Sequence, residues 1–227
     1  TGCNEFFYLT DAQSKKWGIE EEFLKPIIKS PRECKSILIK PEELKYKLFM
    51  CNKSKSELKG TNALNYIEWG EKTEIVVKQG KNKGKKIKGF HKLETIKNRR
   101  RWWSIPSKLP LKVLWPMIHN DRLAVFFNPY SVYVDHNLFE LSFDKIPVSF
   151  FSVMTLFSRE LFGRANLGEG GLKTEGMDIK SFILLDPMYF KYINLDKLQI
   201  FDRPILSIFK ECGIDPNSTT PISEQEP

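Results

Sequence analysis

A short basic segment in the middle of the chain holds the residue types best suited to bind a polyanion. Residues 78–101 contain eleven Lys and Arg and one Glu, a net charge of +10, whereas the whole 227-residue chain has +8. Lysines on flexible backbone neutralise phosphates with little geometric demand, and arginine can contact a guanine edge through two N–H groups or stack on a base. The residues expected to make such contacts are Lys83, Lys85, Lys86, Lys88, Arg99, Arg100 and Arg101.

The basic segment ends at two adjacent tryptophans, Trp102 and Trp103, in an expected strand over residues 102–105. Neighbouring strand residues face opposite sides, so one tryptophan is expected in the core. The other is expected in a further core or subdomain contact, or facing a ligand or a second domain. The charge run by itself also fits a solvated loop, an RNA-binding surface or a surface for acidic lipids.

Three motifs resemble parts of catalytic sites but are incomplete. Asn128-Pro129-Tyr130 lacks the second proline of the Asn-Pro-Pro-Tyr motif, and no glycine-rich turn after a strand precedes it, so a turn between two strands is expected there. The tripeptides 43–45 and 57–59, both Glu-Leu-Lys, match only half of a metal-dependent nuclease site. The glycine-rich residues 168–171 lack the Gly-Lys-Ser/Thr ending of a phosphate loop.

The composition is that of a globular protein, with 41% apolar and 13% aromatic residues. The four cysteines and three histidines are scattered and form no Cys-x-x-Cys pair, which predicts neither a zinc site nor disulfides and favours a reduced, cytoplasmic compartment. No apolar run is long enough for a membrane span, so no membrane partner is expected. The start at Thr1, just before an expected strand, indicates a piece of a longer protein.

Hydrophobic periodicity predicts an α+β fold. Short apolar or alternating runs predict strands at 5–9, 36–39, 46–50, 75–78, 102–105, 111–115, 123–127 and 132–141, with helices over 21–28 and 57–71. After residue 147 we expect helices over 148–162, 189–197 and 203–212, with a glycine-rich loop at 167–172. The predicted domains are a β-rich region over 1–146 with packed helices, a helical C-terminal portion over 147–216 and a disordered tail over 217–227.

Several segments, taken together in their order and spacing, resemble the region that follows the catalytic domain in adenine-specific DNA methyltransferases of restriction-modification systems. The opening Thr-Gly-Cys-Asn is similar to their threonine-glycine-x-asparagine start, and the likeness extends to about Pro187. The similar segments are 1–9, 23–32, 63–71, 101–105, 133–139, 166–173 and 178–180.

This resemblance implies a target-recognition domain that binds double-stranded DNA and selects its sequence. It implies that a separate N-terminal catalytic domain in the same chain binds S-adenosylmethionine and flips the target adenine, so this fragment has no cofactor, metal or catalytic residue of its own. Lys173 and Thr174, beside the glycine-rich loop, are further candidate DNA contacts. An RNA-binding or protein-interaction module and a metal-dependent nuclease remain as alternatives.

Overall fold

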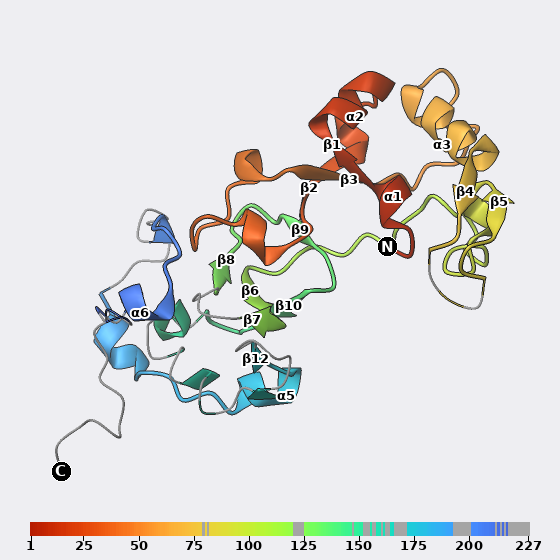
Figure 1. Cartoon of the computed structure of the whole chain (residues 1–227). Helices are drawn as coiled ribbons and strands as arrows, with labels where there is room; N and C mark the ends of the chain where they lie inside the picture. Colours follow the sequence, from red (N-terminus) through yellow and green to blue (C-terminus); the bar gives the residue numbers. More distant parts are fainter. Residues whose placement is uncertain are drawn as a thin grey trace, which may run out of the picture. The chain divides into compact units, whose positions relative to one another are not determined.

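The computed structural model describes residues 1–78, 80, 82–119, 125–146, 148–151, 155, 158–159, 161, 164–165, 172–192, 201–211, 213, 215 and 217. It has the predicted α+β fold, in which short strands and short helices alternate along the chain (Figure 1). The chain forms two compact units, the first from Thr1–Lys29 with Pro41–Leu109 and the second from Ser30–Lys40 with Pro110–Pro227. Among the described residues, no helix is long and apolar enough to cross a membrane.

The sheet of the first unit has β3 (Tyr46–Phe49) between β1 (Tyr8–Thr10) and β2 (Leu24–Ile28), with both pairings antiparallel. The strand predicted at 46–50 is therefore confirmed. The helix predicted over 21–28 is wrong, because a 3-10 turn, η1 (Glu21–Phe23), leads directly into β2. Pro26 lacks the N–H that a helix interior requires, and it lies opposite Lys47 in the strand pairing.

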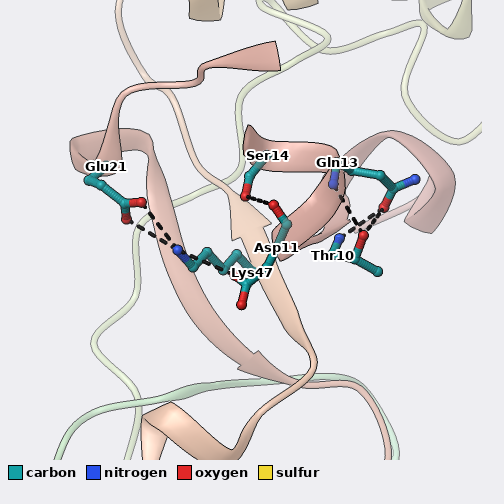
Figure 2. Close-up of polar contacts among 6 residues, drawn as sticks. All are labelled: Thr10, Asp11, Gln13, Ser14, Glu21 and Lys47. Atoms are coloured by element: carbon teal, nitrogen blue, oxygen red, sulfur yellow. Dashed lines mark hydrogen bonds and ion pairs between the residues drawn. The ribbon is translucent and has the colours of Figure 1, made fainter. Parts of the chain in front are cut away.

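The first predicted strand, 5–9, is a helical turn followed by a strand: α1 covers Asn4–Phe7 and β1 begins at Tyr8. Helix α2 (Asp11–Trp17) starts at Thr10, whose side chain and backbone exchange hydrogen bonds with Gln13 in a capping box. Figure 2 shows the ammonium group of Lys47 lying between two carboxylates, 3.5 Å from Asp11 and 3.2 Å from Glu21. These ion pairs join β3 to α2 and η1.

Helix α3 (Asn62–Lys72) is shorter than the predicted helix over 57–71, because Gly60 adopts a left-handed φ of 81° just before it. The side chain of Thr61 accepts a hydrogen bond from the backbone N–H of Leu64, which caps the first turn. The carboxylate of Glu20 accepts two more, from the backbone N–H groups of Asn62 at 2.7 Å and Ala63 at 3.1 Å. A residue 42 positions earlier therefore fixes where α3 begins.

An aromatic cluster forms the core of the first unit. The ring of Phe6, which is fully buried, stacks on Tyr66 with centroids 4.7 Å apart and contacts Trp102 at 4.5 Å. Gly70 of α3 allows this close packing, since a Cβ there would lie 2.8 Å from ring atoms of both Phe6 and Trp102. After α3 come β4 (Glu74–Val76), β5 (Lys86–Lys88) and the 3-10 turn η4 (Phe90–Lys92).

The second unit holds two small antiparallel sheets. In the first, β6 (Val113–Pro116) is the central strand between β8 (Phe126–Phe127) and β10 (Leu138–Leu141). In the second, β12 (Leu172–Lys173) is the central strand between β7 (Ile118–His119) and β11 (Arg164–Ala165). The predicted strand over 132–141 is split between β9 (Tyr133–Val134) and β10. Residues 36–39, also predicted as a strand, form isolated bridges from Ser36 to Pro204 and from Leu38 to Phe127.

The C-terminal helical elements whose bounds the structure describes are short. They are the 3-10 turns η5 (Val148–Phe151) and η6 (Pro187–Phe190) and the helices α5 (Gly176–Lys180) and α6 (Ile208–Glu211). Two further 3-10 turns, η2 (Pro31–Glu33) and η3 (Pro41–Glu43), lie earlier in the chain. Much of the predicted helix over 148–162 and of that over 189–197 lies outside the described residues. So do residues 167–171 of the glycine-rich loop and nearly all of the predicted tail, and the proposed domain boundary at 147 stays a prediction.

Candidate nucleic-acid interface

The first part of the basic segment belongs to an antiparallel hairpin in which β4 pairs with β5; we call the described residues between 74 and 88 the basic hairpin (Figure 1). Ile75 lies opposite Ile87, on the face where Ile75 is buried. The other face carries Lys86 and Lys88, both exposed, with Glu74 across from Lys88. Because side chains alternate between the faces of a strand, this register turns the isoleucines inward and the two lysines toward solvent.

The tip of the basic hairpin extends the pairing beyond the strands and presents two more exposed lysines, Lys83 and Lys85. The backbone N–H of Val77 donates to the carbonyl of Lys85 at 2.9 Å, and that of Gly84 donates back to Val77 at 2.8 Å. Gly84 has a φ of 87° and Gly80 one of 80°, a left-handed conformation that glycine adopts without a steric cost. The glycines among the lysines therefore shape the turn.

Two lysines of the basic hairpin have acidic partners. Lys78 pairs with Glu5, and Lys86 lies 3.4 Å from Glu74. Such exposed pairs contribute at most about 1 kcal/mol, so a phosphate can replace the carboxylate at little cost. Within the described part of the chain, no ion pair is formed by Lys83, Lys85 or Lys88.

The base of the basic hairpin is fixed to α3 through Gly89. Its backbone N–H donates to the carbonyl of Thr73 at 2.7 Å, and its φ is 94°. A Cβ at this position would lie 2.5 Å from the carbonyl oxygen of Glu71, so only glycine fits without a shift of the backbone. The lysines thus extend from a rigidly held base.

The three consecutive arginines have different environments. Arg99 is half-buried and donates to the carbonyl oxygens of Thr1 at 2.6 Å and Ser104 at 3.3 Å. Arg101 donates to the carbonyl of Asn52. Arg100 is exposed and has no partner among the described residues. The structure therefore uses N–H groups of the outer two arginines to hold the segment and leaves the middle one facing solvent.

Both tryptophans are buried, so the alternative in which one faces a ligand is wrong for this structure. The predicted strand over 102–105 is also wrong: these residues form a turn and an irregular stretch. The turn lets two neighbouring indoles point into the same unit, where Trp102 Nε1 donates to Glu71 at 3.0 Å and Trp103 Nε1 donates to the carbonyl of Lys53 at 3.3 Å.

Glu71 connects this turn to the rest of the unit, since its second carboxylate oxygen accepts a hydrogen bond from Lys55 at 2.7 Å. Burial acts to raise the pKa of Glu71, but the hydrogen bonds from Lys55 and Trp102 outweigh it and hold the pKa below the ordinary 4.5. Glu71 is therefore ionised at neutral pH and positions Trp102 directly after the arginines.

The candidates in the second unit are arranged differently. Lys173 lies in β12 and forms an ion pair with Glu175 at 2.5 Å, while Thr174 is fully buried and its backbone N–H donates to Met117 at 2.9 Å. Their role in DNA binding stays a prediction.

The Asn-Pro-Tyr sequence has a structural explanation. Asn128 is fully buried and links the chain before β6 to the end of the expected turn. Its side-chain amide donates to the carbonyl groups of Leu111 at 3.1 Å and Val132 at 2.9 Å, and its oxygen accepts from the N–H of Val132 at 2.9 Å. The turn at 129–130 is confirmed. Among the described residues there is no cluster of metal-binding side chains, and Cys3 and Cys51 are free thiols whose pKa is raised by burial.

Sequence analysis missed a second group of cations in the first unit. The ammonium groups of Lys29 and Lys45 lie 4.4 Å and 5.5 Å from the ring centroid of Tyr46. Lys45 is next to Tyr46 in sequence, but only the pairing of β2 with β3 brings Lys29 to the same ring. A correct strand prediction for 24–28 would have been needed to find it.

Comparison with known proteins places this architecture in a family. The fold is similar to part of the type IIG restriction endonuclease BpuSI, with a TM-score of 0.58 and 15% sequence identity over 91% of this chain. The chain spans 24% of the length of BpuSI. No curated protein matches it. Residues 1–205 match the family described as the C-terminal domain of the type II methyltransferase M.Eco57I, and the chain therefore belongs to this family of restriction-modification methyltransferase C-terminal domains.

Proposed function

We propose that this domain binds double-stranded DNA and selects the target sequence for a restriction-modification methyltransferase. The observation that carries the proposal is the basic hairpin, a two-stranded ribbon with a fixed base that presents Lys86 and Lys88 on its exposed face and Lys83 and Lys85 near its tip. The major groove of B-DNA admits a two-stranded ribbon, and lysines along it reach phosphates on both sides. The proposed contacts are Lys83, Lys85, Lys86, Lys88 and Arg100, with Arg99 and Arg101 holding Arg100 in place.

The methyl transfer itself belongs, in this proposal, to a separate catalytic domain of a longer chain, which binds S-adenosylmethionine and modifies an adenine. Membership in a methyltransferase family supports this division of labour, as does the fact that the chain spans 24% of BpuSI. Within it, the role of the present domain is to grip the duplex and fix its register, which phosphate contacts do, while contacts to base edges specify the sequence.

The test is a salt titration of duplex binding. The variant Lys83→Gln/Lys85→Gln/Lys88→Gln removes three exposed lysines of the basic hairpin that have no acidic partner. The control Lys15→Gln/Lys16→Gln/Lys59→Gln removes the same charge from exposed lysines outside it. Fluorescence anisotropy with a labelled duplex between about 50 and 200 mM salt should give a log–log slope shallower by about 2.7 for the hairpin variant only, since each phosphate contact contributes about 0.9.

Two results would contradict the proposal. Equal losses in the hairpin and control variants would mean that only total charge matters. Tighter binding of single-stranded RNA than of duplex DNA would favour an RNA-binding module instead.

A further inference from the structure

The geometry points to a second phosphate-binding site in the first unit, formed by Lys29, Lys45 and Tyr46, which contacts the backbone of the same DNA. This inference deepens the proposed function and rests on it. Two cations share one aromatic ring here: Lys29 Nζ lies 4.4 Å and Lys45 Nζ 5.5 Å from the centroid of Tyr46. Both ammonium groups therefore lie close to the same side chain.

Neither charge is neutralised by a residue that the structure describes. Among the described residues, no carboxylate lies within ion-pair distance of Lys29 or Lys45, and no hydrogen bond is made by the hydroxyl of Tyr46. The nearby Lys47 provides a contrast, because its ammonium group pairs with both Asp11 and Glu21. In the described part of the chain, Lys47 is therefore paired internally, whereas Lys29 and Lys45 are available to an external anion.

The chemistry of the three groups fits a phosphate oxyanion. Two ammonium groups supply positive charge, and the phenolic O–H of the ring that they share can donate to a phosphate oxygen. Contact with the ring face attracts each ammonium and restricts its side chain before any ligand binds. A restricted side chain loses less conformational entropy on binding, which favours this pair over lysines that extend freely into solvent.

The experiment compares Lys29→Gln/Lys45→Gln with Lys15→Gln/Lys16→Gln, an equal charge change at exposed lysines of α2. In the salt titration with the labelled duplex, the Lys29/Lys45 variant should lower the slope by about 1.8 and reduce affinity on the order of tenfold at 0.1 M salt, while the control keeps the parent slope. Tyr46→Phe, which removes only the hydroxyl, should weaken binding without changing the slope. A slope for the Lys29/Lys45 variant equal to that of the parent overturns the inference, even if the basic hairpin variant behaves as proposed.

A second measurement separates this site from the proposed function. Inorganic pyrophosphate is titrated into the parent domain while the side-chain resonances of its lysines and tyrosines are followed by NMR. If the parent ignores duplex DNA but pyrophosphate shifts the signals of Lys29, Lys45 and Tyr46, the proposed function fails and the phosphate site stands. If it binds no duplex and pyrophosphate moves none of these signals, both are wrong.

Discussion

The indole N–H of Trp102 donates a hydrogen bond to Glu71 at 3.0 Å, and this contact ties the end of the basic segment to helix α3. Because Lys55 donates to the same carboxylate at 2.7 Å, one ionised side chain holds two others in place. The arginines that precede Trp102 are thereby attached to the helix that also supports the basic hairpin. The stability of the unit and the position of the basic segment are connected through this carboxylate.

Glu71→Gln should destabilise the domain at neutral pH by about 1 to 2 kcal/mol, since hydrogen bonds to a charged acceptor become bonds to a neutral one. The pKa of Glu71 is lowered in the folded state, so its contribution is present above the unfolded pKa near 4.5 and is lost as pH falls through the folded value. Urea denaturation at several pH values should therefore show the difference from the parent shrinking below pH 4.5. Glu68→Gln, on the same helix and in an exposed pair with Lys72, should show almost no difference at any pH.

Gly70→Ala should cost about 1 to 3 kcal/mol, because the added methyl group meets the rings of Phe6 and Trp102 and forces them apart. The measurement is the free energy of unfolding in urea. Gly176→Ala in α5 adds the same methyl group where nothing lies within 4 Å, and should cause no loss. If the two variants were equally stable, the aromatic cluster would be looser than the structure indicates.

Asn128→Ala should lower stability by at least about 2 kcal/mol, because it leaves buried backbone groups of Leu111 and Val132 without partners. Asn137→Ala, at an exposed asparagine of the same unit, serves as the control and should be close to neutral. The readout is again chemical denaturation. A purely destabilising effect, with DNA affinity retained in the folded fraction, would agree with the structural role of Asn128.

Arg99→Gln and Arg100→Gln should have opposite profiles. Arg99 donates to two carbonyl groups inside the unit, so its loss should reduce stability by about 1 to 2 kcal/mol. Arg100 is exposed, so its loss should leave unfolding unchanged and make the salt slope of duplex binding shallower by about 0.9. Equal effects of both substitutions on DNA binding would show that the three arginines act together in recognition.

The fold could be predicted from the sequence where pattern and local chemistry agree. The strand over 46–50 and the turn after Asn128 are confirmed, because alternating apolar residues and Asn-Pro are local signals. Residues 21–28 were misassigned because their apolar spacing also fits a helix, while the structure uses them to pair with β3. Tertiary pairing decided between two patterns that the sequence leaves open.

For the candidate site, charge density located the basic segment, but it could not separate cations that hold the protein from those that face solvent. Arg99 and Arg100 are neighbours of the same type, and only the position of the carbonyl groups of Thr1 and Ser104 distinguishes their roles. Lys29 was missed for a related reason, since its partner ring lies on another strand. Such differences arise from contacts distant in sequence.

Under the proposed function, the register of the basic hairpin separates the residues that would contact DNA from those that pack into the unit. Ile75 and Ile87 anchor the inner face and Gly89 fixes the base, whereas backbone bonds from Val77 to Lys85 and from Gly84 to Val77 extend the pairing toward the tip. An exposed lysine of the tip such as Lys83 can therefore be exchanged while Gly80, Gly84 and the anchor stay unaltered. The fold therefore separates the part that can diversify from the part that must be preserved.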